Sequence, residues 1–366
     1  METRVQNRHA DLLVNQRASD TLKLRSHIVQ YLRTFLISKN FLEVQTPILA
    51  DGVGGAVARP FMTSATEFID KTLSLRIAPE IWLKRLVLGG MDRVFEIGPA
   101  FRNEGIDATH NPEFTSCEFY KSFADLEELI TMTERLVVGL AEHVHGLIES
   151  QFTSLLMMDS SYYAEPFNRI EFIPSLEAAM GHKLPSLASE NAPEQVTALF
   201  TALSQELPSS PTLPRLLDKL AAIYLEPQCT KPSFIIHHPA CLAPLAKSYL
   251  DPSTDQLISA RAELFIHCRE VANMYEEENS PFEQRHKFVQ QTRWRDDENC
   301  AVVDESYLEA LEWGLPPTGG WGCGVDRLCM MFSGAEKISD VLSFGSLRNV
   351  VGIGQGFRPK KSYTSE

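Results

Sequence analysis

The sequence lacks the features that mark several other protein classes. It contains no run approaching the roughly 18 consecutive apolar residues of a bilayer-spanning helix. Its start, "METRVQNRHA", has no apolar core of the kind that secretory signals carry. The seven cysteines form no CxxC pair and are odd in number, which favours reduced thiols over a disulfide framework. We therefore expect a soluble intracellular protein without a membrane partner, cytoplasmic or alternatively mitochondrial.

Positive charge is also scarce. Lys and Arg number 34 against 48 Asp and Glu, which gives a net charge of −14 and argues against a surface built to coat nucleic acid. The phosphate-binding loop GxxxxGK[ST] is missing, and "GIGQGF" at 352–357 has neither the right spacing nor a following helix. Any RNA contact must therefore be local, and bound phosphates must be held in another way.

Apolar spacing predicts both helices and strands. Amphipathic helices are expected at 20–39, with Asp20 as a possible N-cap, and at 125–148, with Asp125 as the cap. Strand-like patterns occur in "LSLRIAP", "RVFEIGPAFRNE", "FTSCEFYKSF" and "KPSFIIHHP". Hairpins rather than regular βαβ units connect them. We therefore predict an α+β fold, an antiparallel β-sheet flanked by helices.

The chain divides into three parts by composition. Residues 1–19 are expected to be an N-terminal remnant or linker, 20–350 one large domain, and 351–366 a flexible tail. Within the large domain, about 183–232 is rich in Pro and Ser between helical runs. We interpret that segment as a helical insertion rather than a separate domain.

Two arginines stand at the ends of apolar or glycine-rich segments. Arg102 closes "VFEIGPAFR", and Arg327 follows "GWGCGVD", whose alternating glycines allow a ligand to approach the backbone closely. A guanidinium offers a planar, permanently charged fork to carboxylate or phosphate oxygens. From the residues alone, Arg102 as a rim charge and Arg327 as a solvated arginine stay open as alternatives.

Acidic residues gather in "ELFIHCREVANMYEEE". Glu263 and Glu270 are seven positions apart there. On a bulged strand or on one helix face, both carboxylates could point at a common site and hold a hard cation through oxygen. A solvated acidic face is the alternative.

Three segments resemble, in the correct order, the motifs of the class II aminoacyl-tRNA synthetases. "FLEVQTPIL" resembles motif 1, "FEIGPAFRNEGIDATHNPEFTSCEFY" motif 2, and "GGWGCGVDR" motif 3. The segments "GGAVARPF", "RIAPEIWLKRLVLGG", "NMYEEENSP" and "GLPPTGGWGCGVDR" are similar to the lysyl members rather than to the aspartyl or asparaginyl ones. The likeness runs from about residue 8 to about residue 345.

The resemblance implies a catalytic domain and a lysine–tRNA ligase activity. Such an enzyme activates L-lysine with ATP and Mg²⁺, releases pyrophosphate, and transfers lysine to the 3′ end of tRNA(Lys). Motif 1 builds the dimer interface in this class, so a homodimer is expected, and Pro47 at a strand edge is compatible with it.

The resemblance also implies roles for the residues of motifs 2 and 3. Arg102 would clamp the lysine carboxylate and the ATP α-phosphate, and it and Arg327 would be the catalytic residues. Glu104 and His110 would meet the adenine and phosphates. Phe114 would stack under the adenine while Arg327 covers its other face.

Metal ions and lysine would be held by further matching residues. Glu263, which also belongs to the ATP site, and Glu270 match the family's magnesium ligands, which bridge phosphate oxygens. The positions implied for lysine are Gly55, Glu80, Arg102, Tyr120, Asn273, Tyr275 and Glu277.

Lysine selection would depend on a counter-charge for each amine. The Gly55 carbonyl and Glu80 would hold the α-amine. Glu277 and Tyr120 would hold the ε-ammonium, and a buried carboxylate there rejects uncharged side chains because it would be left unpaired. Glu118 is expected to brace the hairpin rather than to touch substrate.

The chain starts almost at the catalytic domain, whereas lysyl enzymes carry an N-terminal OB-fold barrel that reads the anticodon. Three readings follow: a fragment or incomplete gene model, a shortened synthetase that contacts tRNA through the acceptor stem, or a paralogue that adenylates an amino acid for another acceptor such as elongation factor P. Gly322 favours a synthetase, because that paralogue tends to carry Ala in motif 3. A non-catalytic binding protein is the remaining alternative.

Overall fold

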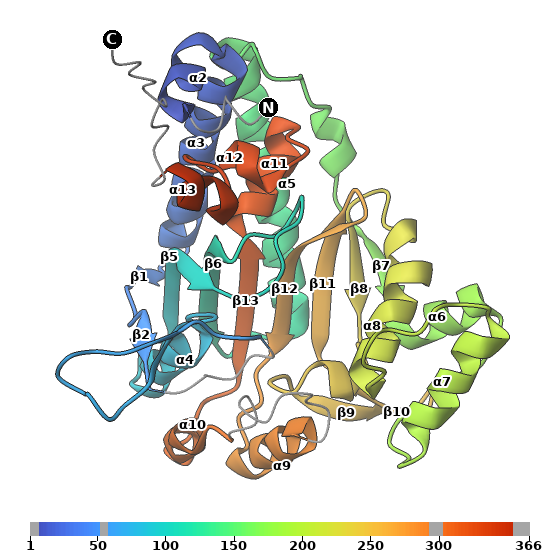
Figure 1. Ribbon diagram of the computed structural model, residues 1–366. Coiled ribbons are helices and arrows are strands. Elements are labelled where there is room, and N and C mark those ends of the chain that lie inside the picture. The colour runs from blue at the N-terminus through green and yellow to red at the C-terminus, as the bar shows by residue number, and fades with distance from the viewer. Residues whose placement is uncertain (1–6, 52–57, 293–302, 354–366) are drawn as a thin grey trace, which may run out of the picture.

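The computed structural model describes residues 7–51, 58–292 and 303–353. Its centre is an eight-stranded sheet in the order β1-β5-β6-β13-β12-β11-β8-β7 (Figure 1). The strands are β1 Leu42–Glu43, β5 Arg93–Phe101, β6 Glu113–Ser122, β13 Thr318–Gly324, β12 Arg269–Glu276, β11 Arg261–Ile266, β8 Ser233–Ile236 and β7 Asn168–Glu171.

The sheet is mixed rather than wholly antiparallel. From β5 to β8 each neighbour is antiparallel, as predicted. At the two edges, however, β1 pairs with β5 and β7 pairs with β8 in parallel. Residues 44–92 connect β1 to β5 and residues 172–232 connect β7 to β8, and parallel neighbours need long connections of this kind. The α+β class is confirmed, and the antiparallel description holds only for the interior strands.

One face of the sheet packs on long helices. These are α3 Gln16–Ser38, α5 Leu126–Ser150 and α11 Val325–Ser333. Leu24, Ile28, Leu32 and Leu36 recur every four residues along α3 and are fully buried in the same core as Phe119 of β6. The opposite face is left free for other contacts.

The two predicted helix caps have different outcomes. Asp125 caps α5 as expected, because its carboxylate accepts the Glu128 backbone N–H at 2.8 Å. Asp20 does not cap α3. Asn15 takes that position, since its side chain accepts from the Ala18 N–H. Asp20 lies in the helix, buried, and accepts from Ser154 Oγ at 2.7 Å.

The first helix, α2 Arg8–Val14, joins the two sequence ends of the described structure. The Arg8 guanidinium pairs with Asp11 at 2.9 Å and donates to the carbonyl oxygens of Asp340 at 3.3 Å and Ser343 at 3.2 Å. Asp340 lies in α12 Ile338–Val341, and α13 Leu347–Ile353 follows. The predicted boundary at residue 20 falls inside α3. Of the predicted tail 351–366, residues 351–353 belong to α13, and the others lie outside the described residues.

Two smaller cores flank the sheet. The first lies beside β8 and β11 and contains α6 Phe172–Met180, α7 Ala192–Ala202 and α8 Leu213–Tyr224, of which α7 and α8 lie within 183–232. The second joins α4 Glu80–Leu88, α9 Pro281–Thr292 and α10 Glu305–Leu311. The remaining elements are β2 Leu49–Ala50, β3 Met62–Thr63, β4 Leu73–Leu75, β9 Ser248–Asp251, β10 Gln256–Ser259, and the 3₁₀ turns η1 Ser160–Tyr163, η2 Glu226–Gln228 and η3 Ala240–Leu242.

Two expectations from composition can be checked on the described residues. Within them, no helix is both long and apolar enough to cross a bilayer. The cysteines there are all free, as predicted. Cys300 lies outside the described residues.

Candidate active site

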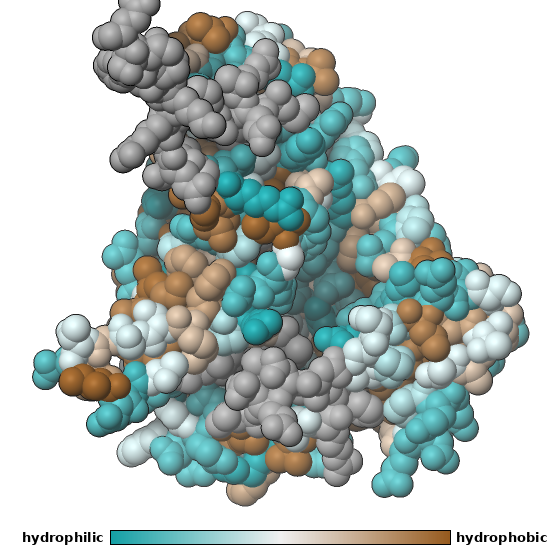
Figure 2. Space-filling model, viewed as in Figure 1, coloured by the Kyte–Doolittle hydropathy of each residue, from teal (hydrophilic) through white to brown (hydrophobic). Residues whose placement is uncertain are grey.

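A cavity of about 1160 Å³ opens on the face of the sheet that α3, α5 and α11 leave free. Figure 2 shows the surface hollowed over the middle of the sheet, with hydrophilic residues in the hollow. Because side chains alternate along a strand, the even-numbered residues Phe114, Ser116, Glu118 and Tyr120 of β6 share this face. That alternation accounts for the polar and aromatic character of motif 2.

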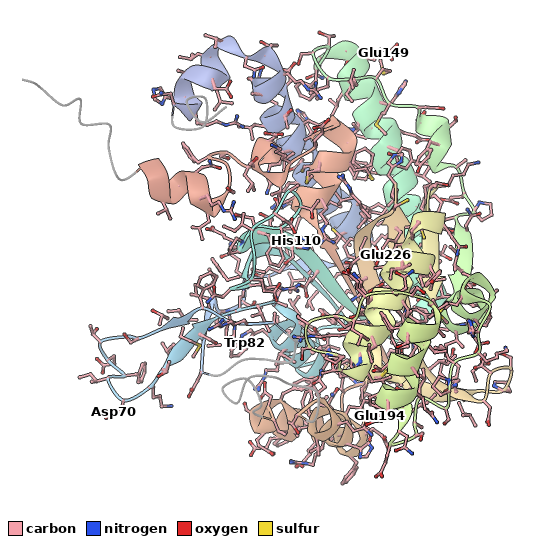
Figure 3. The ribbon with its side chains drawn as sticks, turned by 45° about the vertical axis from the view of Figure 1, so that its right-hand side comes forward. Asp70, Trp82, His110, Glu149, Glu194 and Glu226 are labelled. Carbon is pink, nitrogen blue, oxygen red and sulfur yellow. The ribbon has the colours of Figure 1, made fainter. Side chains whose placement is uncertain are left out.

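Most of the predicted site residues meet in this cavity. Its lining includes Glu80, Arg102, Glu104, His110, Phe114, Tyr120, Glu263, Glu270, Asn273, Tyr275 and Arg327. Of the other two predicted residues, Gly55 lies outside the described residues. Glu277 is fully buried and does not line the cavity. His110 and Glu226, which line the cavity from the β5–β6 loop and from η2, are labelled in Figure 3.

Arg102 follows β5 and faces an aromatic ring. Its guanidinium carbon lies 5.1 Å from the centroid of Phe114, and its backbone N–H donates to the Pro112 carbonyl at 2.8 Å. Among the described residues, its buried Nε has no hydrogen-bond partner. Leaving a buried donor unpaired costs about 1–3 kcal/mol, which a bound carboxylate or phosphate would remove. Its unpaired Nε and its contact with Phe114 distinguish Arg102 from a fully solvated rim charge.

A chain of polar contacts holds the β5–β6 loop over the cavity. His110 Nδ1 lies 2.8 Å from Asp107 Oδ2, and Arg327 Nη2 lies 2.9 Å from His110 Nε2. Arg327 Nη1 in turn lies 3.2 Å from Glu270 Oε2. Since arginine can only donate, this assigns the His110 proton to Nδ1. Hydrogen bonds from the Thr109 and His110 backbone and the His110 ring lower the pKa of Asp107 to about 2.

Glu263 and Glu270 come from the two strands of the β11–β12 hairpin, not from one bulged strand or one helix. Arg261 and His238 hold the Glu263 carboxylate, with His238 Nε2 at 3.1 Å. Burial alone would raise the pKa of Glu263, but the Arg261 guanidinium and the contact with His238 outweigh it and lower that pKa to about 2. Glu263 is therefore ionised at any physiological pH.

Glu263 and Glu270 would need a phosphate ligand beside them to hold Mg²⁺. In the described part of the chain, no three His, Cys, Asp or Glu side chains lie close enough to hold a metal by themselves. Mg²⁺ commonly takes one or two carboxylates and completes its shell with substrate phosphates and water. Two carboxylates, Glu263 and Glu270, are consistent with such a coordination shell.

Glu118 is a site residue that the sequence interpretation missed. It lines the cavity, and the Tyr120 hydroxyl donates to its Oε2 at 3.4 Å. Burial, and then the neighbouring charge of Glu80, raise its pKa to about 8. The signal was present in the sequence, because Glu118 is two residues before Tyr120 and so must share its face.

Lys84 was also missed. It lies one helical turn after Glu80 on α4, and its fully buried ammonium donates to Glu80 Oε1 at 2.6 Å and pairs with Glu277 Oε2. Tyr275 donates to the same Glu80 oxygen at 2.7 Å. Glu277 is predicted to bind a substrate amine, and it already has one cationic partner, Lys84, within the chain.

Glycines of β13 make room for these acids. A Cβ at Gly320 would lie 1.9 Å from Glu277 Oε1 and 2.6 Å from Tyr120 Cε1. A Cβ at Gly322 would lie 3.3 Å from Glu118 Cγ. Gly320 is therefore required by close packing against a functional side chain.

Comparison with known proteins agrees with this arrangement. Residues 1–348 match the family model "tRNA synthetases class II (D, K and N)". The chain is 41% identical to lysine–tRNA ligase cla4 of Cladosporium cladosporioides over 95% of its own length and 59% of that protein. It is 42% identical to a probable cytoplasmic lysine–tRNA ligase of Encephalitozoon cuniculi, covering 95% of this chain and 69% of that one.

A third relative is the mitochondrial lysine–tRNA ligase of Schizosaccharomyces pombe, at 44% identity over 95% of this chain and 66% of that protein. The chain thus spans from 59% to 69% of the length of these three relatives. The match to the family model covers most of the chain, and residues of motifs 2 and 3 meet in one cavity. The protein belongs to the class II tRNA synthetases of the D, K and N group.

Proposed function

We propose that the protein is a lysine–tRNA ligase, which activates L-lysine with ATP and Mg²⁺ and transfers it to the 3′ end of tRNA(Lys). The observation that carries this proposal is one cavity in which the anion clamp Arg102 faces a pocket containing Glu80 and Glu118. An anion-binding end and an acidic end suit a ligand with a carboxylate and two ammonium groups. The names of the relatives support the same substrate.

Lysine would lie across strands β6 and β12. Arg102 and Asn273 would take its carboxylate, while Glu80, together with the Gly55 carbonyl, would take its α-ammonium. Glu118, Tyr120 and Glu277 would surround the ε-ammonium, and Tyr275 would contact the stem. A buried acidic pocket of this kind would reject a ligand without the second amine.

ATP would lie against motifs 2 and 3. The adenine would stack on Phe114 with Arg327 over its other face, and Glu104 and His110 would meet the nucleotide from the loop. Mg²⁺, held by Glu263 and Glu270, would neutralise charge on the pyrophosphate leaving group when bound. Arg327 would give up its contact with Glu270 to reach the γ-phosphate.

The chemistry would need no side-chain nucleophile. A lysine carboxylate oxygen attacks the α-phosphorus of ATP, the new O–P bond forms the lysyl-adenylate, and the bond to pyrophosphate breaks. Arg102 would touch both reacting groups, so that it orients them and stabilises the charge that builds on the α-phosphate oxygens.

Pyrophosphate exchange tests this proposal. The protein should exchange labelled pyrophosphate into ATP only when lysine and Mg²⁺ are both present, and ornithine or norleucine should not replace lysine. A well-folded protein without lysine-dependent exchange would reject the proposal in favour of a non-catalytic binding protein. Charging of bulk tRNA compared with labelling of elongation factor P then identifies the acceptor.

We also propose a homodimer and tRNA contact through the acceptor stem. Leu42, Leu49 and Met62 on the short strands β1, β2 and β3 are about half exposed, which suits a subunit interface. Sedimentation of a stable active monomer would contradict the homodimer.

The named relatives include cytoplasmic and mitochondrial enzymes. We propose that this protein is located in the cytoplasm, and imaging of a fluorescent fusion tests that location.

A further inference from the structure

Lys84 lies at the centre of a closed group of acids and tyrosines. It is fully buried, with Glu80 and Glu277 as ion-pair partners. Its ammonium lies 5.8 Å from the ring centroids of Tyr120 and Tyr275 and 5.6 Å from that of Tyr307. Burying an ammonium costs several kcal/mol of desolvation free energy, which ion pairs with the neighbouring carboxylates must offset.

Glu277 uses only one of its oxygens within this group. Oε2 pairs with Lys84. Oε1, which is buried and has no hydrogen-bond partner among the described residues, lies directly over Gly320. Gly320 pairs with Tyr120, and Gly322 with Glu118, so Oε1 is on the same face of the sheet as the cavity residues. An unpaired buried carboxylate oxygen at this place indicates a missing cationic partner.

The charges of the pocket support that reading. Three carboxylates, Glu80, Glu118 and Glu277, oppose the single ammonium of Lys84, so two negative charges remain when all are ionised. Arg76 and Glu96, which also act on Glu118, form a mutually neutral pair with 2.7 Å between their charged atoms. Arg102 stands at the anion-binding end. Two remaining charges equal the two ammonium groups of a diamino acid.

We propose that Lys84 is a positioning residue for lysine recognition, which orients Glu277 with Oε1 free for the ε-ammonium, favours the ionised form of its carboxyl and sets the pocket's charge to match two amines. This inference rests on the proposed function. Lys84 touches neither the reacting atoms nor, in this geometry, the substrate. It acts through Glu277.

The protonation of Glu277 shows why the ammonium is needed. Burial raises the pKa of Glu277, Lys84 opposes that rise, and Glu80 and Glu118 add to it, so that this pKa lies well above its ordinary value in the free protein. The acids in turn keep the pKa of Lys84 above its ordinary value although burial would lower it. Without Lys84, the pKa of Glu277 would rise further, and a ligand ammonium would meet a neutral carboxyl. The other groups facing this pair are Tyr120, Tyr275 and Tyr307.

The test is the variant Lys84→Met, which keeps an unbranched side chain of similar length and removes the charge. We expect lysine affinity, measured by titration calorimetry, to fall at least about tenfold, because a buried charge pair is broken. The KM for ATP should change by less than about twofold. The loss should deepen toward low pH, where Glu277 is protonated.

Lys287→Met is the matched control. Lys287 of α9 pairs with Glu278 at 2.6 Å, is mostly buried, and does not line the cavity. It should lower the melting temperature and leave lysine affinity unchanged. Wild-type lysine affinity in Lys84→Met, or an equal loss of ATP affinity, would overturn the inference.

A second variant guards against misfolding. In K84M/E277Q a neutral pair replaces the ion pair, which preserves packing without an isolated buried charge. It should fold and bind lysine as weakly as Lys84→Met, and wild-type affinity would overturn the inference.

Experiments on the wild-type protein separate this inference from the proposed function. A wild-type protein that binds lysine but does not exchange pyrophosphate rejects only the proposed function. A wild-type protein that does not bind lysine rejects both.

Discussion

The Arg327 guanidinium lies 2.9 Å from the His110 ring and links the motif 2 loop to helix α11, which begins at the end of motif 3. Both residues line the cavity, and the contact holds the motif 2 loop against α11 on the side where we propose that ATP binds. Replacing His110 with Ala should loosen that closure. We expect the KM for ATP to rise about tenfold, the cost of one charge-assisted hydrogen bond, while the KM for lysine stays constant. An unchanged KM for ATP would show that the contact belongs only to the free protein.

Arg102 should be far more sensitive. Replacing it with Ala removes the group that touches both reacting partners, and we expect lysine-dependent exchange to fall about 10²–10³-fold. Arg102→Lys should recover little, since a lysine cannot supply the planar fork. Arg285→Ala, which breaks an exposed pair with Glu305, is the control and should have wild-type exchange. Appreciable exchange by Arg102→Ala would refute the assignment.

Glu118 predicts how lysine binding depends on pH. Its pKa in the free protein is raised to about 8, so near neutral pH it must release a proton before it can pair with an ammonium. Lysine affinity should therefore increase between pH 6 and pH 9, on the order of tenfold per unit at most, and neutral-pH binding should release protons into the buffer. Glu118→Gln should bind lysine weakly and flatten this profile. Calorimetry in buffers of different ionisation enthalpy measures both effects.

The same carboxyl should make the free protein less stable at alkaline pH. Glu118 binds its proton more tightly when folded than when unfolded, because its folded pKa of about 8 exceeds the ordinary 4.5. The folded state then holds more protons between these values, so the free energy of unfolding falls as pH rises through this range. Glu118→Gln should be more stable than wild type at pH 9, on the order of 1–3 kcal/mol, and equal at pH 4. Denaturant unfolding without lysine would detect the difference, and equal stability at pH 9 would contradict it.

Gly320→Ala tests the packing beneath Glu277. The added methyl would lie 1.9 Å from Glu277 Oε1, so either the acid or the strand must move. We expect a loss of about 1–3 kcal/mol in stability together with weaker lysine binding. Gly146 in α5 is a suitable comparison, because a Cβ there meets nothing within 4 Å. Gly146→Ala should be neutral or slightly stabilising, by up to about 1 kcal/mol.

The sequence predicted those helices that depend on interactions between residues close in the chain. The four-residue spacing in α3 and the Asp125 cap depend on neighbours in the chain, and both helices lie where expected. The N-cap of α3 was misplaced because Asn15 and Asp20 are equally good capping residues, and only the buried contact with Ser154 shows why Asp20 belongs inside the helix. The parallel edge strands could not be predicted, since two- and four-residue strands carry no periodic signal.

Candidate site residues were predictable where they belong to a sequence motif. They were harder to predict where their role depends on contacts with residues distant in the sequence. Arg102, Glu263 and Arg327 were found by pattern and meet in the cavity. Glu118 was assigned to bracing the hairpin, although strand alternation with Tyr120 required it to face the cavity. Lys84 could not be identified because its importance depends on Glu277, which is distant in sequence and adjacent only after folding.

The pairing of β13 with β6 carries a consequence for biosynthesis. Gly320 and Gly322 lie against Tyr120 and Glu118, so the middle of the cavity floor joins an early strand to one made near the end of translation. Hairpins such as β5–β6 and β11–β12 can form as soon as they leave the ribosome, because their contacts are local. Until Thr318 and the residues after it are synthesised, both halves of the floor expose an unpaired strand edge, and the nascent chain then depends most on protection from aggregation.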